Sequence, residues 1–416
     1  MDHQNKRCVG LIAEYNPFHN GHLYHIEKSK ELAHADYCVV VMSGDFVQRG
    51  APAVYDKHTR ARMALEAGAD LVLELPAAFA TSSAEDFATY GIRMLDQLGI
   101  IDAVCFGSEC GDLELLQSAA HILADEPEEY SVLLRDLLKQ GLSFPEARSK
   151  ALLTYMEALG TSTLPAALSS PNNILGIEYC KALIRLDSSI EPLTITRIGH
   201  GYHDTFLSEH LASASAIRTL LQGGTGFDAI ADQVPACVLD QIAQGYPLFP
   251  EDLSFLLNQR LLSLSSQKEP LNQFLDVSDD LALRIQKTVL EYDTFEQRIQ
   301  YLKTRQYTYT RISRALLHIA LGITDADLES YKSQVYLPYV RILGFCKDSA
   351  AILKEIKNNC PSPLITKIAD AAELLSPVGQ HMLEQELYCS HLYQLLKYEK
   401  YHINSKNEYT QELILI

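Results

Sequence analysis

Along the first 110 residues, short apolar runs alternate with longer segments in which apolar and polar residues repeat at helical spacing. Short runs rich in β-branched and other apolar residues predict strands at 9–13, 37–42, 71–75 and 103–106. Longer amphipathic segments predict helices at 21–35, 57–67 and 83–98. Alternation of strand and helix at this pitch predicts an α/β fold with a doubly wound, Rossmann-like parallel sheet.

The remainder of the chain has mostly helical periodicity. Residues 111–160 have helical spacing, and a late strand is expected at 193–198. The glycine-rich stretch 222–226 is the best candidate for a domain boundary, because glycine interrupts both helices and strands. A chain of 416 residues exceeds the size of an ordinary single core. We therefore expect two domains: 1–225, which contains the sheet, and 226–416, which is mainly helical.

Composition narrows the class of protein. The net charge of −18 argues against non-specific binding of nucleic acid, which needs a basic face. The nine cysteines are scattered, odd in number and without CxxC spacing, so we expect reduced thiols and no protein-bound metal. No apolar run is long enough to cross a bilayer, and the N-terminus leaves no room for a signal peptide. These features are typical of a cytoplasmic protein.

Two histidines three residues apart follow the first predicted strand, in the turn His19-Asn20-Gly21-His22. Gly21 permits a ligand to approach the backbone closely, and the N-terminus of the helix that starts here is a natural anion site. The imidazoles of His19 and His22 would donate hydrogen bonds to phosphate oxygens and stabilise the charge that develops during attack at the α-phosphorus. The alternative is a turn with two surface histidines.

In this segment the chain resembles the HIGH-motif nucleotidylyltransferases, and among them the bacterial tRNA(Met) cytidine acetate ligases. The resemblance rests on motifs that occur in the family's order at 14–22, 42–50, 68–76, 106–109, 171–176, 197–198 and 213–218. It covers residues 8–220, and the C-terminal half matches more loosely. Two positions depart from the family: Asp45, where Asn or His is usual, and Ala51, where Glu is usual.

The resemblance implies a reaction in two steps. Acetate and ATP, with Mg²⁺, would form acetyl-adenylate and release pyrophosphate. The exocyclic amine of the wobble cytidine of elongator tRNA(Met) would then accept the acetyl group, which yields N4-acetylcytidine and AMP. The ATP-binding residues that this resemblance implies are Ile12, Ala13, Glu14, Tyr15, Asn16, Pro17, Phe18, His19, Asn20, Gly21, His22, Gly107, Asn172, Asn173, Arg197, Ile198, Ser213, Ser215 and Arg218.

Several of these positions also have an ordinary structural explanation. Gly107 either lies under adenine or ribose or forms a plain tight turn. Of Asn172 and Asn173, we expect one to cap a helix and the other to bind ATP. The turn at 213–218 either closes over the β- and γ-phosphates or is a serine-capped helix.

A loop with glycine at both ends and one arginine follows the second predicted strand. Such a loop suits a carboxylate or a phosphate, and the alternative is an arginine exposed in a loop. The acetate candidates in it are Ser43, Gly44, Gln48 and Arg49.

One segment of the second half, 297–314, is basic and aromatic and contains no acidic residue. Basic side chains bind phosphates and aromatic rings stack on unpaired bases, which would suit an anticodon loop. The tRNA candidates are Arg298, Lys303, Arg305, Tyr307, Tyr309, Arg311 and Arg314. A solvated helix face is the alternative.

Two other functions use parts of the same pattern. A small-molecule adenylyltransferase would need the same histidine and serine/arginine turns, although such enzymes are usually much shorter. A nucleotide-sensing module without chemistry is disfavoured because both histidines are present.

Overall fold

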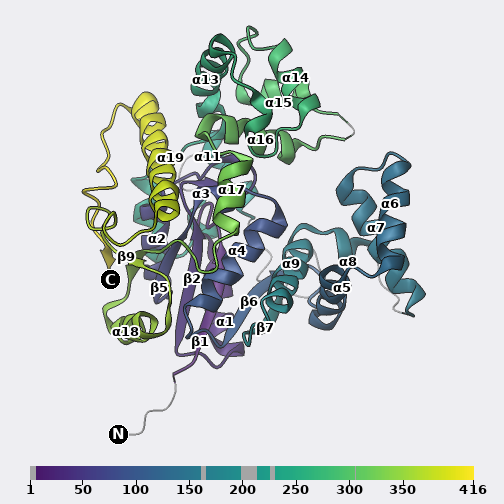
Figure 1. The fold of residues 1–416 in the computed structure, drawn as a ribbon. Helices are drawn as coiled ribbons and strands as arrows, with labels where there is room; N and C mark the ends of the chain where they lie inside the picture. Colours follow the sequence, from purple (N-terminus) through teal and green to yellow (C-terminus); the bar gives the residue numbers. More distant parts are fainter. Residues whose placement is uncertain (1–5, 161–164, 198–212, 225–229, 305) are drawn as a thin grey trace, which may run out of the picture.

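The computed structural model describes residues 6–160, 165–197, 213–224, 230–304 and 306–416, and Figure 1 shows its fold. A mixed sheet forms the centre, with helices on both of its faces. In the described part of the chain, no helix is both long enough and apolar enough to cross a membrane.

The parallel part of the sheet has the order β5-β2-β1-β6-β7. Its strands are β1 (Cys8–Ala13), β2 (Tyr37–Ser43), β5 (Leu71–Leu75), β6 (Ala103–Ser108) and β7 (Glu191–Thr196). Side chains alternate between two apolar cores: Val39 and Val41 belong to one, and Cys38 and Val40 to the other. The predicted α/β class with a doubly wound parallel sheet is therefore confirmed.

The crossover helices follow the expected order. They are α1 (Asn20–Leu32), α2 (Lys57–Glu66), α3 (Ala77–Ala80) and α4 (Ala84–Gln97). A small hairpin of β3 (Phe46–Val47) and β4 (Ala51–Pro52) lies between β2 and α2. The helices that follow β6 are α5 (Leu113–Asp125), α6 (Glu128–Lys139), α7 (Phe144–Ala158), α8 (Pro165–Ser169) and α9 (Pro171–Arg185).

The C-terminal half is mainly helical. Its helices are α11 (Ala214–Gln222), α12 (Leu239–Ala243), α13 (Ser254–Gln267), α14 (Asp279–Lys287), α15 (Phe295–Leu302), α16 (Tyr309–Leu321), α17 (Asp325–Lys332), α18 (Ala350–Asn359) and α19 (Pro377–Tyr401). Short 3₁₀ turns lie at 231–233, 236–238, 250–253, 271–273 and 347–349. In Figure 1, α13–α16 form a group above the sheet, and α19 lies along its side.

Three strands from beyond residue 225 extend the sheet. They are β8 (Val340–Phe345), β9 (Leu364–Ile365) and β10 (Ile414–Leu415). β8 pairs antiparallel with β5, and both β9 and β10 pair parallel with β8. The sheet is therefore not confined to the first of the two domains expected at 1–225 and 226–416, because the last 77 residues contribute to its core.

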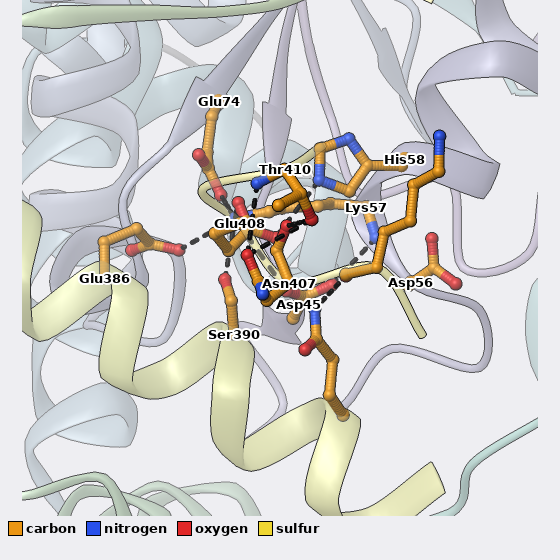
Figure 2. A network of polar contacts seen from close by, with 12 residues as sticks. Asp45, Asp56, Lys57, His58, Glu74, Glu386, Ser390, Asn407, Glu408 and Thr410 are labelled. Atoms are coloured by element: carbon orange, nitrogen blue, oxygen red, sulfur yellow. Dashed lines mark hydrogen bonds and ion pairs between the residues drawn. The ribbon is translucent and has the colours of Figure 1, made fainter. Parts of the chain in front are cut away.

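A buried network of charged side chains fastens these C-terminal segments to the sheet (Figure 2). We call it the Lys57 network; its members are Asp45, Lys57, Glu74, Arg341, Glu386 and Glu408. The Lys57 ammonium has no exposed surface and lies 2.6 Å from Glu74 Oε1 and 3.3 Å from Glu408 Oε2. It also donates a hydrogen bond of 2.7 Å to Ser390 Oγ on α19.

The network contains more carboxyl groups than cations, and protonation relieves the difference. Burial, and next the neighbouring Glu74, raise the pKa of Glu386 well above its ordinary value. Burial would also raise the pKa of Glu74, but Arg341 and Lys57 hold it below the ordinary value. Burial beside Glu74 therefore favours the protonated form of Glu386, which reduces the excess of negative charge in the network.

Replacing Lys57 with methionine should destabilise the protein strongly. The change leaves Glu74 and Glu408 buried with one cation fewer, and breaking a buried ion pair in this way costs about 3–5 kcal/mol. Lys332→Met is the control, because Lys332 pairs with Asp86 at 3.1 Å but has 42% of its side chain exposed. Its loss should cost about 1 kcal/mol or less. Denaturant unfolding measures both, and equal losses would contradict this account of the network.

Candidate nucleotide site

The turn after β1 holds His19 and His22 through their own backbone. His19 is the N-cap of α1, and its Nδ1 accepts a hydrogen bond of 3.0 Å from the backbone N–H of Gly21. Nδ1 of His22 in turn accepts from the backbone N–H of His19 at 3.3 Å. The two rings stack with their centroids 3.7 Å apart. The pair is thus locked in one orientation by the first turn of the helix.

Both imidazoles are neutral donors. Burial, followed by the charges of Arg197 and Arg218, lowers the pKa of His19 to about 4. Burial and the neighbouring His19 lower the pKa of His22 well below its ordinary value. Since each Nδ1 accepts a hydrogen bond, each neutral ring carries its proton on Nε2. The turn therefore presents two N–H donors beside the N-terminus of α1.

Arginines from three separate segments supply positive charge at this point. Arg218, on α11, donates to the backbone oxygen of Asn16 at 2.7 Å and to Ser215 Oγ at 2.9 Å. Burial, and then the charge of Arg49, lower the pKa of Arg218, so these two cations lie near each other. The charge of Arg197 contributes to lowering the pKa of both His19 and His22. Neutral donors surrounded by arginines suit a polyphosphate.

Two further ATP candidates, Ser213 and Gly107, lie at the start of α11 and near the end of β6. Ser213 is the N-cap of α11 and accepts from the backbone N–H of Ala216 at 3.2 Å, as expected for a serine-capped helix. Arg197 lies against Gly107, with its Cγ 3.0 Å from the position that a Cβ would take there. Ile198 falls outside the described residues.

Asn172 and Asn173, in the first turn of α9, are tied to Glu109, which directly follows β6. Asn173 is 1% exposed, and its Oδ1 accepts from the backbone N–H of Glu109 at 2.8 Å. Asn172 Nδ2 donates to Glu109 Oε1 at 2.7 Å. The N-cap of α9 is Ser170, so the expectation that one of the asparagines caps the helix is wrong. A carboxylate from another loop satisfies the free N–H groups here, which local sequence could not indicate.

The acetate candidates divide into an inner and an outer pair. Ser43 has no exposed surface. A Cβ at the buried Gly44 would come within 2.9 Å of Glu386 Oε1 and 3.0 Å of Glu74 Oε1. Ser43 is therefore closed to a ligand and Gly44 lies against carboxylates of the Lys57 network, so the acetate role expected of this inner pair is not supported. Gln48 and Arg49, half-buried and exposed respectively, remain the acetate candidates.

Asp45 belongs to the same inward-facing part of the loop. It is 3% exposed, and its Oδ1 accepts from the backbone N–H of Lys57 at 2.8 Å. Burial raises its pKa. The departure from the family at this position therefore changes the Lys57 network and not the surface of the loop.

Several basic and aromatic residues of 297–314 form hydrogen bonds or ion pairs with other residues of the protein. Arg298 is 1% exposed and donates to Asn258 Oδ1 at 2.8 Å and to the backbone oxygen of Glu291 at 2.6 Å, so it is removed from the tRNA candidates. Arg314 pairs with Asp276 at 2.8 Å. The segment contains no acid, but other segments bring acids to it, which the sequence pattern could not show.

The aromatic candidates are likewise held by the protein. Tyr307 is 8% exposed, and its hydroxyl lies 2.6 Å from Ser278 Oγ. The Tyr309 hydroxyl donates to Glu296 Oε2 at 2.5 Å. Lys303 is exposed, and Arg311 is half-buried with its guanidinium over the Tyr307 ring. Arg305 lies outside the described residues.

Sequence reasoning gave Lys57, Arg60 and Glu109 no individual role at this site, although Glu109 lies in the motif at 106–109. The signal available for the first two was weak: two basic residues, one helical turn apart, in a segment that also has to pack against a buried sheet.

Comparisons with known proteins agree with this geometry. A family model described as HIGH Nucleotidyl Transferase matches residues 6–408. A tRNA(Met) cytidine acetate ligase of Acetivibrio thermocellus is 40% identical and covers 99% of this chain and 100% of its own. A tRNA(Met) cytidine acetate ligase of Clostridium perfringens is 40% identical, and the match covers 93% of this chain and 95% of the relative. The crystal structure of Thermotoga maritima TmcAL bound with alpha-thio ATP superposes with a TM-score of 0.90 at 30% identity, covering 99% of both chains.

The neutral state of His22 leads to a prediction about its replacement. His22→Ala should slow the nucleotide chemistry about a hundredfold, the usual effect of losing one donor to a developing charge. His22→Gln should remain within about tenfold of the wild type, because the glutamine amide places an N–H donor near the position of imidazole Nε2. Steady-state rates measure both, and His121→Gln on the exposed surface of α5 is the control. Equal losses in the alanine and glutamine variants would mean that the reaction needs an imidazolium.

Proposed function

Because the chain belongs to the HIGH nucleotidyl transferase family, and within it to the tRNA(Met) cytidine acetate ligases, we propose that it is an ATP-dependent ligase that acetylates tRNA. It activates acetate as acetyl-adenylate and transfers the acetyl group to N4 of the wobble cytidine of elongator tRNA(Met). The observation that carries this proposal is the pair of neutral histidine donors at the N-terminus of α1, with arginines from three segments beside them.

In the first step, an acetate oxygen attacks the α-phosphorus of ATP and pyrophosphate leaves. Negative charge grows on the phosphate oxygens, and the Nε2–H groups of His19 and His22 donate to them without prior reorganisation. Arg218, which donates to Asn16 and Ser215, would neutralise charge on the departing pyrophosphate. In the second step the cytidine amine attacks the acyl carbon, its proton is lost, and AMP is released.

Mg²⁺ in this proposal arrives with the nucleotide. The described residues contain no group of three or more His, Cys, Asp or Glu side chains placed to hold a metal ion. Mg²⁺ commonly keeps several waters and binds through substrate phosphates, and it would there neutralise charge on the leaving pyrophosphate.

Gln48 and Arg49 are proposed to bind the acetate. The backbone N–H of Gln48 donates to Glu14 Oε1 at 2.9 Å, which brings this loop beside the nucleotide turn. The Gln48 side-chain Nε2 is buried and has no hydrogen-bond partner. A carboxylate would satisfy that donor, and Arg49 supplies the matching charge.

The tRNA is proposed to dock on α16 and on the residues just before it. Ser313 Oγ on α16 donates to the backbone oxygen of Gly50 at 2.9 Å, so this helix lies directly against the loop that bears Arg49. Among the described residues, Lys303 and Arg311 are the basic candidates that form no salt bridge, although the charge of Arg311 acts on Asp276. Arg305 is kept as a candidate from sequence. A tRNA bound there would reach the site of the acetyl-adenylate.

Labelled acetate tests the function. The wild-type protein with ATP, labelled acetate and elongator tRNA(Met) should place label on the tRNA as N4-acetylcytidine and release AMP and pyrophosphate. Nucleoside mass spectrometry identifies the product, and tRNA with uridine at the wobble position is the control substrate. Product formed from acetyl-CoA without ATP would refute the proposal. Transfer of AMP to a phosphorylated metabolite, with no labelled tRNA, would favour the small-molecule adenylyltransferase instead.

Neutralising the accessible basic residues tests the tRNA surface. Lys303→Gln with Arg311→Gln should weaken tRNA binding and lower the slope of log K against log salt by about 0.7–0.9 for each lost phosphate contact. Acetyl-adenylate formation should continue unchanged. The control is Lys354→Gln with Lys357→Gln, two exposed residues on α18, which lies at the far end of the molecule from α16 in Figure 1. Unchanged affinity in the first double variant would move the tRNA site elsewhere.

A further inference from the structure

Arg60 is a fully buried arginine on α2 whose guanidinium is satisfied entirely by backbone oxygens. Its Nη1 donates to the oxygen of Glu14 at 2.7 Å and to that of Ser43 at 3.0 Å. Nε donates to the oxygen of Tyr55 at 2.8 Å, and Nη2 donates to that of Gly44. In the part of the chain that the structure describes, no carboxylate pairs with Arg60, so its contacts fix the course of the backbone.

The backbone segments that Arg60 joins are those that bear the proposed ligand side chains. Glu14 belongs to the nucleotide turn after β1, and Ser43 and Gly44 begin the loop after β2 that carries Gln48 and Arg49. Tyr55 ends that loop before α2. We propose that Arg60 is a positioning residue, which sets the acetate loop at the correct distance and angle from the nucleotide turn. This inference rests on the proposed function.

The peptide that Arg60 holds in the nucleotide turn has an unusual conformation. Tyr15, the residue after Glu14, adopts a φ of 49°, in the left-handed region that a non-glycine residue enters at a cost of about 1–3 kcal/mol. A hydrogen bond to the Glu14 oxygen fixes the plane of the peptide that leads into it. Arg60 thereby stabilises the backbone course that leads from β1 to His19.

Other bonds hold the two loops together but engage them at other points. The backbone N–H of Val54 donates to Asn16 Oδ1 at 2.8 Å, and that of Gln48 to Glu14 Oε1 at 2.9 Å. Both depend on side chains that reach across from the nucleotide turn. Arg60 instead acts from α2, beneath both loops, and its planar fork sets several carbonyl directions at once. A lysine ammonium, whose donors leave a single atom, cannot reproduce that spread.

The reaction should be more sensitive to this alignment than nucleotide binding is. ATP is held in the proposal by His19, His22, Arg197 and Arg218, and none of these side chains bonds to Arg60. Acetyl-adenylate formation requires in addition that acetate on the second loop lies in line with the α-phosphorus. A displacement of about 1 Å in such a geometry lowers the rate about a hundredfold.

The test compares R60K with R298K. Arg298 is a matched control, since it is also buried and donates to backbone oxygens, but it lies on α15 in the helical group above the sheet (Figure 1). In R60K the kcat for acetyl-adenylate should fall at least about tenfold. The Kd for ATP should stay within about threefold of the wild type, and R298K should retain both values. Hydrogen exchange should increase at 13–18 and 43–56 in R60K alone.

The outcomes separate this inference from the proposed function. If the wild-type chain makes no acetyl-adenylate, the proposed function is refuted. Hydrogen exchange then tests the inference without activity: an increase at 13–18 and 43–56 in R60K alone supports a positioning role for Arg60, and unchanged exchange contradicts it. A wild-type kcat in R60K with unchanged exchange overturns the inference, as does an equal loss of kcat in R298K. R60M, which keeps the stem and removes every donor, is made in parallel. If R60K and R60M are both unfolded where R298K folds, Arg60 is a structural residue only.

Discussion

The Lys57 ammonium has no contact with solvent, and the carboxyl groups around it come from segments that lie far apart in the sequence. An uncompensated charge in such a place is costly, so the folded state requires β5, α2, β8, α19 and the C-terminal tail to meet at one point. This requirement explains why the last part of the chain completes the sheet instead of forming a detached domain. The same lysine holds Asp45 at the base of the loop after β2, and thereby links the core to the candidate site.

The site itself depends on neutral donors placed by backbone geometry. The first turn of α1 uses Nδ1 of both histidines as acceptors, which leaves Nε2–H of each ring for a ligand. Burial and nearby arginines keep the rings neutral, so the positive charge at the site comes from Arg49, Arg197 and Arg218. Arg60 holds the backbone of the two loops, because its guanidinium donates to the backbone oxygens of Glu14 and Ser43. Charge and geometry are thus supplied by different residues.

The protein has a net charge of −18, and yet its proposed substrates are all anions. The structure resolves this conflict locally. Near the nucleotide turn the charges of Arg197 and Arg218 both act on His19, and that of Arg49 acts on Arg218. The Glu14 carboxylate accepts from a backbone N–H, and Arg60 donates to the backbone oxygen of Glu14. In the acid-free segment 297–314, by contrast, Arg314 pairs with Asp276 from an earlier segment, and Tyr309 donates to Glu296, the residue just before the segment. A run of like charge in the sequence therefore does not equal a patch of that charge on the surface.

The strand and helix order of the first 110 residues, the turn at His19 and His22 and the membership of the family all followed from the sequence, because periodicity and turn chemistry are local. Asn172 and Asn173 were singled out from the sequence as ATP candidates, which stays a prediction. Their link to Glu109 could not be predicted, since that carboxylate comes from a distant segment. Only the tertiary structure showed that Ser43, Gly44 and Arg298 are buried. It alone also showed the strand at 340–345 and the roles of Lys57 and Arg60. Each depends on which distant group supplies a partner for a buried charge or carbonyl, and sequence spacing carries no information about that.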